Sequence, residues 1–318
     1  MKHCFPLVIS LVLVTLAACV TEGPVRLDPI PLTDEEIAFL RKLEDPETFS
    51  QVQEVPALFQ GLSSLHDAWL EAYLSKDSPK NIRIYTNLGG VLTRRVYVNY
   101  EAILDQFHNG PQPNRVIAAA ALGFSRIPES PRFPPVHQSA VDALLGSLDC
   151  GDDAIVKNAL LSLYNLGDQD MPLEKVLDIM VHHHDPDIRS NAALAVLTSV
   201  TLDKTDLVLP YVLPGLKDDD PKVRTHCVLI AIKIKDRSTI TALLELLADP
   251  YDLIRAAAVR ALGHMNDPSL CGSLIPLLKS RKEIVREYTF LSLKQLSGED
   301  FGDDHDDWMD WWNDLRKG

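Results

Sequence analysis

Three consecutive histidines, His182, His183 and His184, form the cluster in the sequence that most resembles a set of metal ligands. They stand at the end of a predicted helix, directly before Asp185-Pro186, a pair that favours a turn. Consecutive residues on a helix point about 100° apart, so three imidazoles in a row do not converge on one ion. We interpret the cluster as a solvated turn and expect neither a metal site nor a cofactor.

Signals for other kinds of catalysis are equally weak. The chain has no glycine-rich phosphate loop and no G-x-S-x-G nucleophile motif. The acidic pairs Asp303-Asp304 and Asp306-Asp307 could indicate calcium, but they lack the spaced ligands, central glycine and closing glutamate of a calcium-binding hand. The sequence therefore predicts a protein that is not an enzyme.

A tryptophan-rich segment near the C-terminus is the other chemically distinctive stretch. Trp308, Trp311 and Trp312 are spaced three and four residues apart, so they share one face of a short predicted helix. We favour a helix at 299–318 that caps the end of the fold with its indoles. An aromatic platform for a sugar or a peptide is the alternative.

The N-terminal pattern indicates an export signal. A short basic start, Met1 to His3, precedes an apolar run from Phe5 to Leu16 that is too short for a comfortable membrane span. The run ends in LAAC, residues 16–19, which resembles the lipobox of bacterial lipoprotein precursors. That resemblance implies removal of residues 1–18 and acylation of Cys19; an ordinary signal peptide is the alternative. Since Val20 is not aspartate, the Gram-negative sorting pattern implies the outer membrane, with the protein facing the periplasm.

Composition fits a protein held at a membrane by lipid. The chain has 31 basic and 45 acidic side chains, a net charge of −14, which argues against nucleic acid as a partner. Cys150, Cys227 and Cys271 are too few and too widely spaced for a disulfide framework, and Cys227 reads as a small core residue. Prolines keep residues 19–32 extended as a tether. Residues 33–63, with helices from Thr33 and over 54–62, then form an N-terminal helical cap.

From residue 64 to 298 the chain repeats. Each unit is an amphipathic helix, a polar turn, and a second apolar helix that opens with a basic anchor residue. Successive anchors lie 32, 42, 32, 35, 31 and 31 residues apart. The long interval holds a proline-rich loop insertion, residues 126–139. The anchors are Arg83, Arg115, Lys157, Arg189, Arg224, Arg255 and Arg286. Stacked units of this length are typical of an α-solenoid.

The units resemble HEAT repeats. The matching segments are DPDIRSNAALAVL (185–197), DDDPKVRTHCVLIAI (218–232) and DPYDLIRAAAVRALG (249–263). The resemblance implies an all-α, right-handed α-solenoid of about seven helix-turn-helix repeats with helical caps at both ends.

It also implies a ladder between adjacent repeats, made by the anchors and an aspartate six residues before each. Asp77, Asp218 and Asp249 fit that place. The other units have Asn109, Gly151, His183 and Ser280 there, so we expect an incomplete ladder. We expect Arg255 and Asp249 to retain a ladder pair.

HEAT-like enzymes are poorly matched. The di-iron hydroxylases use His-Glu pairs, and no His-Glu dipeptide occurs in the chain. The DNA glycosylases use a basic groove, and nothing identifies the bilin site of the lyases. We expect a non-catalytic, membrane-anchored scaffold with a curved surface for a protein partner. In the HEAT family the second helices line the concave face, so exposed positions after Arg189, Arg224 and Arg255 are the expected contact surface. A module that binds a peptide or a glycan, in that groove or on the tryptophan face, is the alternative.

Overall fold

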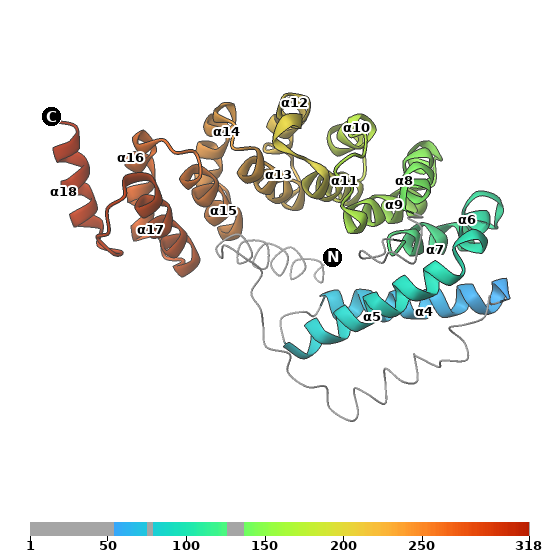
Figure 1. The fold of residues 1–318 in the computed structure, drawn as a ribbon. Coiled ribbons are helices and arrows are strands. Elements are labelled where there is room, and N and C mark those ends of the chain that lie inside the picture. The colour runs from blue at the N-terminus through green and yellow to red at the C-terminus, as the bar shows by residue number, and fades with distance from the viewer. Residues whose placement is uncertain (1–53, 75–78, 126–136, 318) are drawn as a thin grey trace. The chain divides into compact units, whose positions relative to one another are not determined.

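The structure is a computed structural model that describes residues 54–74, 79–125 and 137–317. The described residues form helices, turns and loops, with no strand among them (Figure 1). The signal peptide, Cys19, the tether, the helix expected from Thr33, Asp77 and residues 126–136 of the proline-rich loop lie outside the described residues. Within the described part, no helix is both long enough and apolar enough to cross a membrane.

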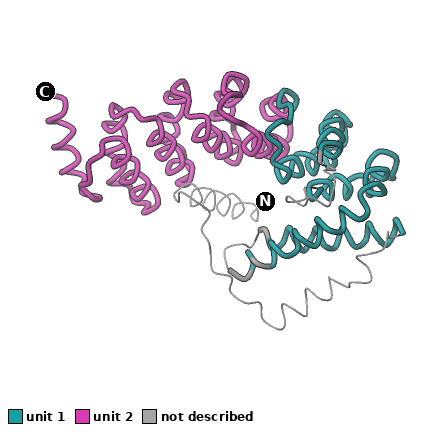
Figure 2. The backbone as a smooth tube through the Cα atoms, in the orientation of Figure 1, with its two compact units in different colours: residues 1–175 teal, residues 176–318 magenta. Residues whose placement is uncertain are grey.

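The chain divides into two compact units, residues 1–175 and 176–318, which Figure 2 distinguishes by colour. We call them unit 1 and unit 2 and describe each by itself. Both are built from helix pairs in which the second helix carries the basic anchor. The predicted all-α solenoid class is therefore confirmed.

The described residues of unit 1 form three helix pairs. They are α4 (Val55–Leu74) with α5 (Pro79–Val98), α6 (Tyr100–Asn109) with α7 (Gln112–Leu122), and α8 (His137–Gly146) with α9 (Asp153–Leu166), the last joined through the 3-10 helix η1 (Ser147–Asp149). The side chain of Asp152 caps α9 by accepting from the amides of Ala154 and Ile155. Gly167 ends α9 in the left-handed conformation, at φ 57°.

The N-terminal boundary differs from the expected one. We predicted one helix over 54–62 and a second from residue 64, but α4 runs through both without a break. The hydroxyl of Ser64 donates to the carbonyl of Gln60 at 3.1 Å, within the helix itself. A serine can bond back to its own helix in this way, so Ser63-Ser64 does not end it.

Unit 2 holds four helix pairs and a final helix. The pairs are α10 (Glu174–His182), most of which lies in unit 2, with α11 (Pro186–Ser199); α12 (Thr205–Gly215) with α13 (Pro221–Ile234); α14 (Ile240–Glu245) with α15 (Asp252–Gly263); and α16 (Cys271–Leu274) with α17 (Glu283–Ser297). The final helix is α18 (His305–Leu315). Five short 3-10 helices lie directly before or after the first helices of these pairs: η2 (Leu202–Lys204), η3 (Arg237–Thr239), η4 (Leu246–Ala248), η5 (Pro268–Leu270) and η6 (Ile275–Lys279).

The starts of the second helices follow from local chemistry. Asp185 and Asp220 cap α11 and α13, and each cap is followed by a proline at the first helical position. Proline fits there because that position needs no amide donor and its φ is already helical. The turns before α11 and α13 are therefore fixed by sequence. The anchor arginine is the fourth residue of these two helices and also of α15 and α17.

The second helices form the centre of unit 2. Residues 223–232 of α13 and 256–263 of α15 are all buried. Uninterrupted burial over more than two helical turns is expected for a helix packed on all faces. Cys227 is one of these core residues, as predicted. A Cβ added to Gly215 of α12 would lie only 2.4 Å from its Sγ.

Candidate functional site

Four arginines of unit 2 share one backbone contact. In each, Nη1 donates to the carbonyl oxygen six residues earlier, in the turn before its helix. The pairs are Arg189 with His183 at 2.9 Å, Arg224 with Asp218 at 2.8 Å, Arg255 with Asp249 at 2.7 Å, and Arg286 with Ser280 at 2.8 Å. This bond ties each turn to its helix and uses one donor of the guanidinium.

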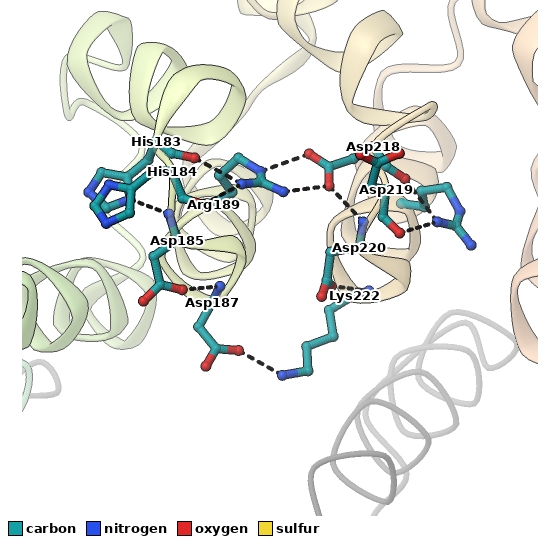
Figure 3. Close-up of polar contacts among 10 residues, drawn as sticks. His183, His184, Asp185, Asp187, Arg189, Asp218, Asp219, Asp220 and Lys222 are labelled. Carbon is teal, nitrogen blue, oxygen red and sulfur yellow. Dashed lines mark hydrogen bonds and ion pairs between the residues drawn. The ribbon is translucent and has the colours of Figure 1, made fainter. Parts of the chain in front are cut away.

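Two of these arginines also reach the next repeat. Nε and Nη2 of Arg189 donate to the two carboxylate oxygens of Asp218 at 2.8 and 2.9 Å (Figure 3). The same two nitrogens of Arg224 donate to Asp249 at 2.8 and 3.2 Å. We call the Nε–Nη2 edge of an arginine its fork, and such a two-bond pair between consecutive repeats a rung. Planar two-bond pairs of this kind are among the stronger polar contacts in proteins.

The rungs are shielded from water and fully bonded. Arg224 and Asp249 retain 9% and 6% of their accessible surface. Each aspartate also accepts the amide two residues later, from Asp220 at 2.8 Å or Tyr251 at 2.9 Å. The bond to Asp218 raises the pKa of Arg189 above its ordinary value. Because the carboxylate is satisfied from both sides, its burial is compensated.

The ladder stops after two rungs. At the place of Asp218 and Asp249 the next repeat has Ser280, and Arg255 turns to Asp252 on its own helix. Our expectation that Arg255 pairs with Asp249 needs correction: Arg255 takes only the main-chain carbonyl of Asp249, while the carboxylate binds Arg224. Among the described residues, no carboxylate pairs with Arg286.

The anchors of unit 1 behave differently. Nε of Arg115 donates to the carbonyl of Phe107 at 3.2 Å, eight residues earlier. Asp152 accepts a bond from Gln112 at 3.0 Å, and that bond, ahead of the nearby charge of Arg115, lowers its pKa. Lys157 lies on α9. The side chain of Arg83 lies outside the described residues.

Further polar contacts join α11 and α13 beside the first rung, and they were not predicted from the sequence. Lys222 pairs with Asp187 at 2.7 Å, beside the rung in Figure 3. Nδ1 of the buried His226 lies 3.1 Å from the Ser190 hydroxyl on α11. Burial, ahead of the other influences, lowers the pKa of His226 to about 4. These partners lie 35 and 36 residues apart, close to the repeat length, which is the signal that could have found them.

Close backbone approach is a second type of contact between repeats. A Cβ added to Gly263 would lie 2.6 Å from Oγ of Ser292, and one added to Gly123 would lie 2.6 Å from Oγ of Ser162. Each serine hydroxyl donates across the contact, from Ser292 to the Val259 carbonyl at 3.1 Å and from Ser162 to the Ala119 carbonyl at 2.7 Å. Glycine is required at both places because only hydrogen fits.

The histidine cluster adopts a different geometry from the predicted one. Helix α10 ends at His182, so the helical-spacing argument does not apply to His183 and His184. Their rings stack, with centroids 4.5 Å apart. Nδ1 of His183 accepts the amide of Asp185 at 3.1 Å, and both carbonyls accept from Arg189. In unit 2 the carbonyls of this segment thus hold the guanidinium of Arg189, which forms the first rung (Figure 3).

The tryptophans lie on the inner side of α18. Trp308 is fully buried, and its Nε1 donates to the carbonyl of Gly302 at 2.9 Å. Trp312 lies against Gly272 of α16, where an added Cβ would be 2.8 Å from its ring. Trp311 contacts both other indoles, with centroids 5.7 and 6.1 Å away. Indoles packed in this way cover the last helix pair, which is the geometry of a cap.

Comparison with known proteins agrees with the repeat geometry. A family model described as HEAT repeats matches residues 173–259 and 240–303. Residues 173–303 are HEAT repeats. The matched residues contain both rungs and the helix pairs of unit 2. No curated protein sequence matches the chain.

Solved structures resemble the chain in fold. The Escherichia coli protein YibA has a TM-score of 0.50 at 15% identity, over 85% of this chain and all (100%) of that one. An engineered protein has a TM-score of 0.49 at 17% identity, over 62% of this chain and 96% of that one. The complex of CpcE and CpcF of phycocyanin lyase, from a Nostoc species, has a TM-score of 0.37 at 18% identity, over 93% and 98%. At these identities the likeness concerns the fold alone.

Proposed function

We propose that this HEAT-repeat protein is a non-catalytic scaffold that presents its helical surface to a protein partner. The observation that carries the proposal is that the charged side chains at the joints of unit 2 bind one another across repeats. The forks of Arg189 and Arg224, the carboxylates of Asp218 and Asp249, and His226 are all engaged in contacts between repeats. Side chains that could take part in a reaction are held there by buried structural bonds.

The partner surface differs from the one the HEAT resemblance implied. Helices α11, α13 and α15 have only two exposed residues, Pro186 and Lys233. Exposed side chains lie instead on the first helices and in the turns, for example Asp206, Lys217 and Glu245. Turns and first helices of unit 2 are therefore the first surfaces to test for a partner.

Lipid anchoring is part of the proposal. The N-terminal pattern predicts an acylated Cys19, and acyl chains bind a bilayer at about 0.8 kcal/mol per buried methylene. We place the protein on the bacterial outer membrane, facing the periplasm, because Val20 follows the cysteine. A tethered scaffold would hold its partner near that membrane.

Crosslinking of the membrane fraction, followed by mass spectrometry, tests the scaffold role. The expected result is one or a few proteins joined to residues in the turns and first helices of unit 2. Reversing the exposed charge of Lys217 and Glu245 together should lower the yield, while Gly90→Ala in unit 1, on an exposed face with open space, serves as the matched control. Failure to capture any specific protein under several crosslinking chemistries would argue against a scaffold.

Anchoring is tested separately by fractionation. Cys19→Ala should move the protein from the membrane to the soluble fraction, while Cys150→Ala, at an exposed thiol, should leave it membrane-bound. Equal membrane partitioning of the Cys19→Ala variant and the parent would contradict the lipid anchor.

A further inference from the structure

Arg286 is the last of the four arginines that hold the turn before their helix. Its Nη1 donates to the Ser280 carbonyl at 2.8 Å, as Nη1 of Arg224 donates to the Asp218 carbonyl at 2.8 Å. Both arginines are the fourth residue of their helix. The shared contact leaves Nε and Nη2 for a second partner, which is the next repeat's aspartate for Arg224 and Asp252 of its own helix for Arg255. Among the described residues, Arg286 makes no such pair with Glu283, at the place of Asp252, so its fork is available to a group from outside the chain.

No repeat aspartate follows Arg286. Helix α18 packs on η6, which precedes α17, and its Asp306 forms an ion pair with Lys279 at 3.6 Å. Within the described part of unit 2, neither α18 nor any other element brings a carboxylate to Nε or Nη2 of Arg286. The side chain is partly exposed, so an external group can reach it.

Basic residues outnumber acidic ones around Arg286, although the chain as a whole is acidic: residues 279–287 hold four basic side chains against Glu283 and Glu287. The turn before α17 carries Lys279, Arg281 and Lys282. Lys282 pairs with Asp252 at 2.8 Å, whereas Arg281 is exposed and has no carboxylate partner among the described residues. An incoming anion therefore meets two cationic groups, Arg281 and Arg286, that no side chain described in the structure neutralises.

We propose that the fork of Arg286 is a carboxylate-binding site for an aspartate in a turn of the protein partner. The partner carboxylate would accept from Nε and Nη2, as Asp249 accepts from Arg224 inside the chain. A planar fork matches a carboxylate with two parallel bonds, which a lysine cannot do. This proposal rests on the scaffold function above, since it names the chemistry by which the scaffold holds its partner.

The chain itself supplies a probe. A fluorescein-labelled peptide with the sequence of residues 247–252, LADPYD, carries the Asp-Pro turn whose aspartate occupies the fork of Arg224. Fluorescence anisotropy with the full-length protein measures its affinity. A peptide of sequence LANPYD, with an amide in place of that carboxylate, is the matched ligand control.

Arg286→Ala should weaken binding of the peptide about tenfold or more, because two charge-assisted bonds are lost. Arg286→Lys should weaken it almost as much, while Arg281→Ala should change it about twofold through charge alone. Thermal unfolding followed by circular dichroism checks that each variant keeps its helical fold.

Three results would overturn the proposal: equal binding of LADPYD and LANPYD, full binding by the folded Arg286→Lys protein, or displacement of the peptide by inorganic phosphate at equal concentration. The last would indicate a general oxyanion site. Failure here is distinguishable from failure of the scaffold function. If Arg286→Ala does not affect the crosslinked partners, the scaffold function is supported and this site is contradicted. If the peptide binds at Arg286 but no protein is crosslinked, the site is supported and the scaffold function is contradicted.

Discussion

Four of the contacts between second helices are of two kinds, which we call charged joints and close joints. The charged joints, α11 with α13 and α13 with α15, are each closed by an arginine–aspartate rung. The close joints, α7 with α9 in unit 1 and α15 with α17 in unit 2, are closed by a glycine against a serine. Where Ser280 interrupts the ladder, Gly263 and Ser292 bring the backbones together instead.

The two kinds of joint differ in how their stability can be lost. A rung depends on both partners, since removal of one leaves a buried charge without compensation. A close joint depends on volume, since any side chain at the glycine must push the helices apart. Substitutions at equivalent positions should therefore have different costs, and these differences order the predictions.

The largest loss should follow removal of the buried carboxylate of a rung. Asp249→Ala should lower the free energy of unfolding by about 3–5 kcal/mol, because it leaves Arg224 buried without its partner. Denaturation in urea, followed by circular dichroism, measures the change. The matched control is Asp219→Ala, an exposed aspartate one residue from a ladder position, which should cost less than about 0.5 kcal/mol. Similar losses in the two variants would mean that the rung contributes nothing of its own.

Acid should loosen the first charged joint through His226. Its pKa is about 4 in the folded protein and 6.5 in an exposed histidine, so the unfolded state binds the proton first. The contribution of neutral His226 is complete above pH 6.5 and is lost as pH falls toward 4. The slope is about 1.4 kcal/mol per pH unit, or about 3 kcal/mol in total.

Unfolding in urea at several pH values checks this dependence, with His226→Gln as the comparison. Between pH 6.5 and 4, the parent should lose stability more steeply than the variant. The aspartates with lowered pKa values contribute equally to both proteins, so they cancel in the difference. Parallel curves would contradict a buried, neutral histidine.

A methyl group at a close joint should have an intermediate effect. Gly263→Ala places a Cβ 2.6 Å from Oγ and 3.1 Å from Cα of Ser292, and should cost about 1–3 kcal/mol. Gly123→Ala should do the same in unit 1, where the Cβ would lie 2.8 Å from Cα of Ser162. Gly90→Ala is the control, because its Cβ meets nothing within 4 Å, and alanine there should stabilise α5 by about 0.5–1 kcal/mol. Unfolding in urea again gives all three values; neutral results at Gly123 and Gly263 would show that the helices separate freely.

Much of the fold could be predicted because its signals are local. Asp-Pro turns, the anchor arginines and the spacing of apolar residues lie within a few residues of one another, and each anchor falls on a second helix. The boundary placed between residues 63 and 64 was wrong for a local reason as well. Serine is tolerated inside a helix when its hydroxyl bonds to the preceding turn, as Ser64 does with Gln60.

The contacts between repeats were harder to predict. Local spacing relates Arg255 to Asp249, but the carboxylate of Asp249 binds Arg224, 25 residues before it. The segment AALAVL at 192–197 is continuously apolar, which already indicates a helix with little exposed surface. Only the packed structure shows which partner covers which face.

The smallest effect should come from converting a close joint into a charged one. Ser280→Asp restores the missing carboxylate beside Arg255, and it can also keep the cap that Ser280 Oγ makes to the Lys282 amide at 3.3 Å. Arg255 must exchange its bond to Asp252 for the new rung, so we expect a gain of only about 1 kcal/mol in the free energy of unfolding. Ser280→Asn is the control, because it can cap the turn without forming a charge-assisted fork. An equal gain in both variants, or a gain that survives Arg255→Lys, would mean that the cap and not a third rung is responsible.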